Sequence, residues 1–157
     1  MDNDAVFINI KCVPMFPRSY PICFINFIER VVQLVNIERT SRGIPALRPA
    51  YDLFQAAAIR AQEISVVMSH TRPNGLPSQS MFHNGEYTIG ENIAGGYTTP
   101  EAAVQGWMES PGHRANILNR DNKELGVGYY YENNSTYKHH WVQMFRRPMP
   151  RPSFYWW

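Results

Sequence analysis

The spacing of the apolar residues changes once along this chain, and that change limits the folds it can adopt. In the first part they recur three and four positions apart, as in helices: Ile28, Val31, Val32, Val35, then Leu53, Ala57, Ala61, Ile64 and Met68. After residue 124 they alternate along the chain, as in strands: Leu125, Val127, Tyr129 and Tyr131. Helices that precede a late sheet predict an α+β fold in which helices pack on an antiparallel sheet.

Capping and turn residues predict where the elements begin and end. Gly43 is placed to end the first helix, and the second helix is expected over residues 51–69. Thr99 and Ser110 are each followed by a proline, so they predict helices that start at residues 100 and 111. Two strands, 125–131 and 137–145, are joined by a short turn and should pair antiparallel. The glycine-rich, polar region from Gly75 to Gly96 is expected to be a loop.

Prolines mark off both ends of the predicted domain. Residues 1–26 have no clean period and contain three prolines, so we expect a loosely structured N-terminal extension. The domain itself is predicted over residues 27–145, and residues 146–157, with three more prolines, are predicted to form a C-terminal tail. The chain has no run of about 18 apolar residues, so no transmembrane span is expected. The acidic start, with Asp2 and Asp4, gives no convincing signal peptide.

Charge and cysteine content narrow the functional classes. A net charge of +2 over 157 residues is too small to indicate a nucleic-acid-binding protein. Both cysteines, Cys12 and Cys23, lie near the N-terminus, where they could close a small loop or remain free thiols. The predicted core contains no cysteine, so its stability should not depend on disulfides.

Two histidines and one carboxylate form the candidate site. His70 follows the second predicted helix, and His113 falls in the first turn of the helix that Ser110 precedes. Because a helix N-terminus disfavours a cation, we expect His113 to stay neutral, the form that binds metal. Glu91 lies between the two histidines in a glycine-flanked turn, and two His with one carboxylate are a plausible Zn²⁺ set. Their spacing follows no local metal motif, so the alternative is that each side chain bonds its own turn.

Other residues are weaker candidates. His139 and His140 are neighbours in a strand, so they should point to opposite faces and cannot chelate one ion; a surface position is expected. His83 and Glu86 could line the same cleft, although solvent exposure is the simpler expectation. Trp107 is expected in the core rather than as a platform for a ligand.

Several ordered blocks carry a resemblance to a known family: VNIER at 35–39, RAQE at 60–63, HTRPNG at 70–75, GENIA at 90–94, the segment 107–118, LGVG at 125–128 and WVQMF at 141–145. Together they resemble the CAP superfamily of cysteine-rich secretory, antigen 5 and pathogenesis-related proteins, in its bacterial, disulfide-free SCP-like variant. The resemblance implies a three-layer α-β-α sandwich with a central antiparallel sheet. It also implies a cleft that contains His70, Glu91 and His113, and some family members bind Zn²⁺ through the two histidines. Ser110 stands where many members carry a second acid, so the cleft keeps three of the four groups and gains a hydroxyl.

The resemblance implies an extracellular protein, because members of the superfamily are usually secreted. Since the chain shows no activated nucleophile, we expect a non-enzymatic module whose cleft binds a divalent cation or a small ligand. The first alternative is a hydrolase of peptides or cell-wall polymers, in which His70 and His113 hold Zn²⁺ and Glu91 is the catalytic candidate, as general base. The second is a lipid- or sterol-binding protein, suggested by the arginines and aromatic residues of the tail. In each case the two imidazoles should lie close enough to share one ion, with Glu91 bonded beside one of them.

Overall fold

The computed structural model describes residues 22–82 and 87–148 of the 157-residue chain. Its elements follow in this order: α1 (Ile22–Thr40), β1 (Arg48–Pro49), α2 (Tyr51–Val66), the 3₁₀ helix η1 (Ser78–Met81), β2 (Tyr87–Gly95), α3 (Pro100–Glu109), α4 (Pro111–Leu118), β3 (Glu124–Tyr131) and β4 (His139–Pro148). None of the helices within these described residues is long and apolar enough to cross a membrane.

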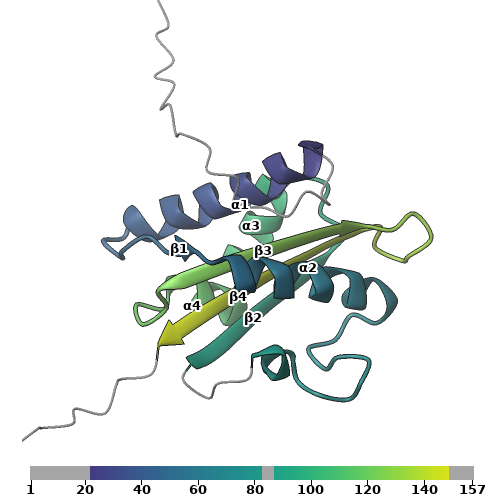
Figure 1. Cartoon of the computed structure of the whole chain (residues 1–157). Coiled ribbons are helices and arrows are strands. Elements are labelled where there is room, and N and C mark those ends of the chain that lie inside the picture. Colours follow the sequence, from purple (N-terminus) through teal and green to yellow (C-terminus); the bar gives the residue numbers. More distant parts are fainter. Residues whose placement is uncertain (1–21, 83–86, 149–157) are drawn as a thin grey trace, which may run out of the picture.

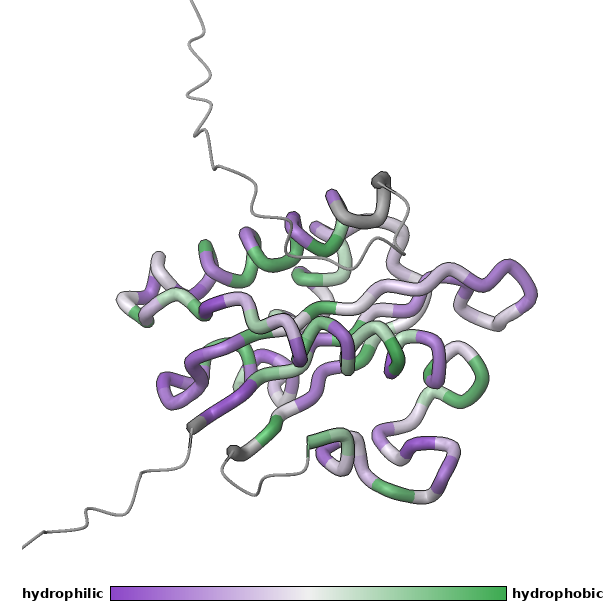
Figure 2. The backbone as a smooth tube through the Cα atoms, in the orientation of Figure 1, coloured by the Kyte–Doolittle hydropathy of each residue, from purple (hydrophilic) through white to green (hydrophobic). Residues whose placement is uncertain are grey.

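The strands form one sheet in the order β1-β3-β4-β2. β4 lies in the middle and pairs antiparallel with both β3 and β2, which confirms the predicted β3–β4 hairpin. β1 adds two residues in parallel to the edge of β3, so the sheet is antiparallel except for this short strand. The polar tip of the β3–β4 hairpin extends beyond the layers of the domain (Figure 2).

Helices cover both faces of the sheet (Figure 1). On one face, α2 packs through Leu53, Ala57 and Ile64 against Val142 and Met144 of β4. On the other face, α1, α3 and α4 form a second core with the opposite sides of β3 and β4: Ile28, Val31, Val35, Val104, Trp107, Ile117, Leu125, Val127, Tyr129, Trp141 and Phe145. The three-layer α-β-α sandwich is confirmed.

Small residues let α2 lie unusually close to the sheet. A Cβ atom built on Gly126 would lie 2.2 Å from the carbonyl carbon of Leu53, and one on Gly128 would lie 2.1 Å from the carbonyl oxygen of Ala57. Only glycine fits where the backbones of two elements approach so closely. The alanines of α2 and the glycines of β3 therefore form one close contact.

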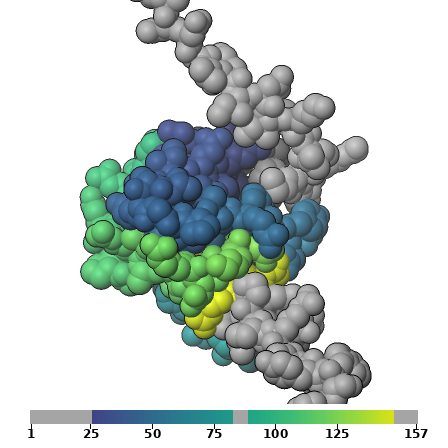
Figure 3. All heavy atoms as spheres, turned by 90° about the vertical axis from the view of Figure 1, so that its left-hand side faces the viewer, coloured from purple at the N-terminus to yellow at the C-terminus, as the bar shows by residue number. Residues whose placement is uncertain are grey.

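A buried arginine ties the end of α1 to the end of α4. Arg39 is 1% exposed, and its guanidinium donates to carbonyl oxygens of Pro45, Ile117, Asn119 and Asn122, with distances from 2.7 to 3.3 Å. Burial is the main cause that lowers the pKa of Arg39, with a smaller effect from the charge of Arg120. Seen from this end, α1 and the green region that includes the start of β3 lie against each other (Figure 3).

The structure differs from the sequence-based expectations at several boundaries. α1 begins at Ile22 rather than within the predicted domain, and α2 ends at Val66, three residues early. β4 continues to Pro148, past the expected start of the tail, because residues 146–148 pair with residues 87–89 of β2; Arg146 also forms ion pairs with Asp52 and Glu124. Most of the expected N-terminal extension, with Cys12, and residues 149–157 of the expected tail lie outside the described residues.

Strand β2 was not predicted from the sequence. The region from Gly75 to Gly96 has the composition of a loop, yet Tyr87–Gly95 pairs with β4 over nine residues. Its buried positions include Glu91 and Asn92, which hydrogen-bond to other side chains instead of packing as apolar residues. The strand therefore lacks the apolar alternation on which a prediction would rest.

Candidate functional site

The four predicted cleft residues come from three parts of the fold. His70 lies in the segment after α2, Glu91 lies in the middle of β2, and Ser110 and His113 lie at and just after the start of α4. The expectation that Glu91 occupies a turn is wrong: it is a strand residue opposite Met144 of β4. The proline-led starts of α3 and α4 are confirmed, although only Thr99 accepts a capping hydrogen bond through its side chain.

Glu91 and His70 form a direct pair. The Nδ1 atom of His70 lies 2.8 Å from Oε1 of Glu91. The Glu91 side chain is 2% exposed and that of His70 is 60% exposed, so a buried carboxylate supports an imidazole at the surface. This confirms the prediction that Glu91 bonds beside one of the two histidines.

Arg60 is a member of this site that the sequence analysis did not identify. From the buried face of α2 it donates through Nε to Oε2 of Glu91 at 2.8 Å and through Nη2 to Oε1 at 3.3 Å. Burial opposes its charge, but the hydrogen bonds that it donates to Glu91 and Glu63 outweigh burial and raise the pKa of Arg60 above its usual value. The sequence did contain a sign of this role: an arginine within the alanine-rich, core-facing part of α2 is expected to be buried, and a buried guanidinium requires a partner.

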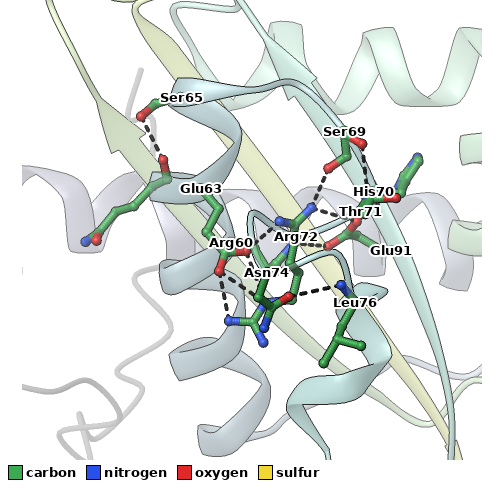
Figure 4. Close-up of polar contacts among 11 residues, drawn as sticks. Arg60, Glu63, Ser65, Ser69, His70, Thr71, Arg72, Asn74, Leu76 and Glu91 are labelled. Carbon is green, nitrogen blue, oxygen red and sulfur yellow. Dashed lines mark hydrogen bonds and ion pairs between the residues drawn. The ribbon is translucent and has the colours of Figure 1, made fainter.

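The ion pair extends away from the cleft through Glu63 and Arg72 (Figure 4). Glu63 accepts from Nη1 of Arg60 at 2.6 Å and from Nη2 of Arg72 at 2.8 Å. Burial acts against ionisation of Glu63, but hydrogen bonds from Arg72 and Arg60 lower its pKa overall. Arg72 therefore fastens the segment that carries His70 to α2.

Side-chain amides hold α4 against β2 and so position His113. Asn92 donates to the carbonyl oxygen of His113 at 3.0 Å, and Asn116 donates to Oδ1 of Asn92 at 2.8 Å. Trp107 of α3 donates to the carbonyl oxygen of Ile93 at 3.3 Å. These bonds join α3 and α4 to β2, the strand that carries Glu91.

The environment of His113 favours its neutral form. Burial lowers the pKa of His113, and the nearby charge of His70 lowers it further. The direction agrees with the sequence-based expectation, although burial rather than the helix end is the largest cause.

A pocket of about 360 Å³ opens beside His113. Its lining is mainly apolar and aromatic, with one serine and one imidazole: Met68, Ile93, Ala94, Gly95, Tyr97, Gly106, Trp107, Ser110, His113 and Tyr137. A Cβ atom on Gly106 would lie 2.2 Å from the hydroxyl oxygen of Tyr97, so this tyrosine lies directly against the α3 backbone. Ser110 and His113 face the pocket, whereas His70 and Glu91 lie outside its lining.

The structure limits which groups can hold a cation. Within the described residues, no group of three or more His, Cys, Asp or Glu side chains is arranged to hold a metal ion. Glu91 is poorly placed as a third ligand, because its side chain is 2% exposed and accepts hydrogen bonds from Arg60 and His70. Of the two histidines, His113 lines the pocket and His70 is bonded to Glu91.

The weaker candidate residues lie in different environments. His140 is fully buried, so its expected surface position is wrong: β4 is an inner strand, and Ser135 of the hairpin bonds Nε2 of His140 at 3.2 Å. His139 is partly exposed and lies 2.8 Å from the Tyr129 hydroxyl. Trp107 is a core residue, as expected, but it also lines the pocket. His83 and Glu86 lie outside the described residues.

Comparison with known proteins places the chain in a family. The model of the CAP family, the cysteine-rich secretory protein family, matches residues 32–145. YkwD of Bacillus subtilis is 38% identical over 116 residues, which cover 71% of this chain and 45% of YkwD. The membrane protein YlbC of the same organism is 52% identical over 114 residues, covering 67% of this chain and 33% of YlbC. The chain thus spans less than half the length of either relative.

Solved structures share the fold. An extracellular protein of Bacillus anthracis that contains an SCP domain superposes with a TM-score of 0.68 at 28% identity, covering 78% of this chain and 40% of that one. An outer surface protein of Borrelia burgdorferi superposes with a TM-score of 0.69 at 16% identity, covering 78% of this chain and 93% of that one. The second likeness concerns the fold alone.

Proposed function

Because the chain belongs to the CAP family of cysteine-rich secretory proteins, we propose that it is an extracellular, non-enzymatic binding module. The extracellular location is supported by the Bacillus anthracis protein, which is described as extracellular and matches most of this chain. The binding site is the pocket beside His113, with His70 and Glu91 next to it.

One observation carries the proposal: both oxygens of Glu91 are engaged. Arg60 occupies Oε2, and His70 occupies Oε1. A general base must lie within reach of the water or proton it acts on, and the Glu91 side chain is only 2% exposed. No carboxylate is found among the described residues that line the pocket. The arrangement suits binding better than hydrolysis.

The pocket suggests the class of ligand. Its volume of about 360 Å³ lies at the lower end of the range for small-molecule sites. Tyr97, Trp107 and Tyr137 offer apolar surface, while Ser110 and His113 offer polar contacts at one side. The ligand is therefore small and mainly apolar, with one polar group or a bridging cation, such as Zn²⁺, at His113 and His70. A lipid or sterol fragment belongs to this class.

Calorimetric titration with Zn²⁺ tests the cation. Binding at neutral pH is expected for the full chain, and His70→Ala or His113→Ala should weaken it at least tenfold, because each removes one imidazole. His139→Gln is the matched control, since that ring contacts Tyr129 rather than the site. Equal affinity in all four proteins would show that the cleft histidines do not bind the metal.

A ligand screen and a hydrolase screen test the rest of the proposal. Small apolar compounds should change the fluorescence of the chain, because Trp107 lines the pocket. Ser110→Phe should abolish the change by filling the pocket, while Gln105→Phe, on the exposed side of α3, should preserve it. Turnover of peptides or cell-wall polymers that is abolished by Glu91→Gln would overturn the non-enzymatic assignment.

A further inference from the structure

A buried guanidinium group lies directly behind the His70–Glu91 pair. The side chains of Arg60 and Glu91 are 1% and 2% exposed. Besides its two bonds to Glu91, Arg60 donates through Nη2 to the carbonyl oxygen of Ser69 at 2.6 Å. Arg60 thus holds both the carboxylate beside His70 and the backbone immediately before it (Figure 4).

The hydrogen-bonding capacities of these groups decide which nitrogen of His70 carries the proton. A guanidinium can only donate, and in contact with it a carboxylate is favoured in its ionised form, which can only accept. Oε1 of Glu91 is therefore an acceptor, and Nδ1 of His70, 2.8 Å away, must carry the hydrogen. When the ring is neutral, its lone pair is then on Nε2.

We propose that Arg60 is a positioning residue: through Glu91 it fixes neutral His70 in the Nδ1–H tautomer and leaves Nε2 as the nitrogen available to a ligand. The use of Nε2 for binding rests on the proposed function, whereas the tautomer itself does not. Glu63 completes the arrangement, because it accepts from Nη1 of Arg60 and from Arg72. Two guanidinium groups and two carboxylates then balance, so His70 need not be charged to neutralise them.

An amide in place of the carboxylate provides the sharpest test. In Glu91→Gln one end of the group accepts and the other donates. Because Arg60 can only donate, the amide oxygen should face its Nε, which makes the shorter contact with Glu91, 2.8 Å against 3.3 Å for Nη2. The amide nitrogen then faces Nδ1 of His70 and donates to it. His70 should change to the Nε2–H tautomer.

The two tautomers are distinguished by long-range ¹H–¹⁵N NMR of the histidine rings in the ¹⁵N-labelled full chain. Spectra are recorded without metal or ligand at about pH 9, where imidazoles are ordinarily neutral. The expected result is Nδ1–H in the wild type, Nε2–H in Glu91→Gln, and Nδ1–H in the control Arg72→Gln, which leaves the Arg60–Glu91 contact in place. An Nδ1–H tautomer in Glu91→Gln, or an Nε2–H tautomer in the wild type, would overturn the proposal.

A second variant covers the case in which Glu91→Gln does not fold. Arg60→Gln removes the Nε and Nη2 donors that hold the Glu91 carboxylate in place, so the carboxylate can turn away from Nδ1 of His70. A mixture of tautomers is expected, and a single unchanged Nδ1–H signal would overturn the proposal. Because no ligand is present in these spectra, failure here leaves the binding proposal standing. Likewise, a chain that shows the expected tautomers but binds no Zn²⁺ or small compound refutes the binding proposal alone.

Discussion

Replacing Gly128 by alanine should push α2 away from the sheet. The new Cβ atom would lie 2.1 Å from the carbonyl oxygen of Ala57, 2.3 Å from its carbonyl carbon and 2.7 Å from the nitrogen of Ala58. Ordinary contacts begin near 3.4 Å, so the backbone of α2 would have to withdraw by about 1.3 Å.

The obstacle is helix backbone, which cannot rotate aside as a side chain can. Overpacking a core typically costs about 1–3 kcal/mol. Withdrawal of α2 would also loosen its contacts with Val142 and Met144. We therefore expect the free energy of unfolding to fall by about 3 kcal/mol, the upper end of that range. The same shift would lengthen the contact between Arg60 and Glu91, so the perturbation reaches the candidate site.

Urea unfolding followed by tryptophan fluorescence measures this loss, because Trp107 and Trp141 are buried. Gly112→Ala is the control: it lies in the exposed first turn of α4, and nothing lies within 4 Å of the added Cβ atom. That substitution should be neutral or stabilise by about 0.4–1 kcal/mol. A Gly128→Ala protein within about 1 kcal/mol of the wild type would refute the argument from close packing.

Three further predictions use the same unfolding assay. Arg60→Met should cost about 3–5 kcal/mol, because it leaves the buried Glu91 without its cation. Adding Glu91→Gln should recover part of that loss, and a double-mutant cycle without coupling would contradict the ion-pair explanation. Burial and the charge of His70 lower the pKa of His113, so the unfolded state takes up a proton first as the pH falls below about 6.5. The contribution of His113 to the free energy of unfolding should be fully present above this pH and should decline below it. The His113→Gln variant should therefore lose less stability than the wild type between about pH 8 and pH 5. Thr99→Ala should cost about 1 kcal/mol, because Thr99 accepts the capping bond of α3; no change would mean that the cap is not needed.

Local signals in the sequence were sufficient for much of the fold. Thr99 and Ser110, each followed by proline, mark the starts of α3 and α4, since capping involves residues only a few positions apart. Gly43 has the positive φ of 67° expected of a residue that ends a helix. The hairpin of β3 and β4 follows from two alternating segments with a short connection. The same reasoning identified His70, Glu91 and His113 but not how they are held.

The sequence by itself determined the fold class, the starts of these helices and the residue types available for chemistry, because each depends on spacing along the chain. Only the tertiary structure decided that Glu91 lies in a strand. It also decided that Arg60, 31 residues away in the chain, forms an ion pair with Glu91. It also decided that His140 is buried, since β4 acquires its inner position by pairing with β2. The residues next to Glu91 and Arg60 in the sequence do not indicate that the two side chains are partners. Such partners meet only when α2 and β2 pack on the same sheet, which is why the role of Glu91 as an acceptor between two donors emerges from packing rather than from pattern.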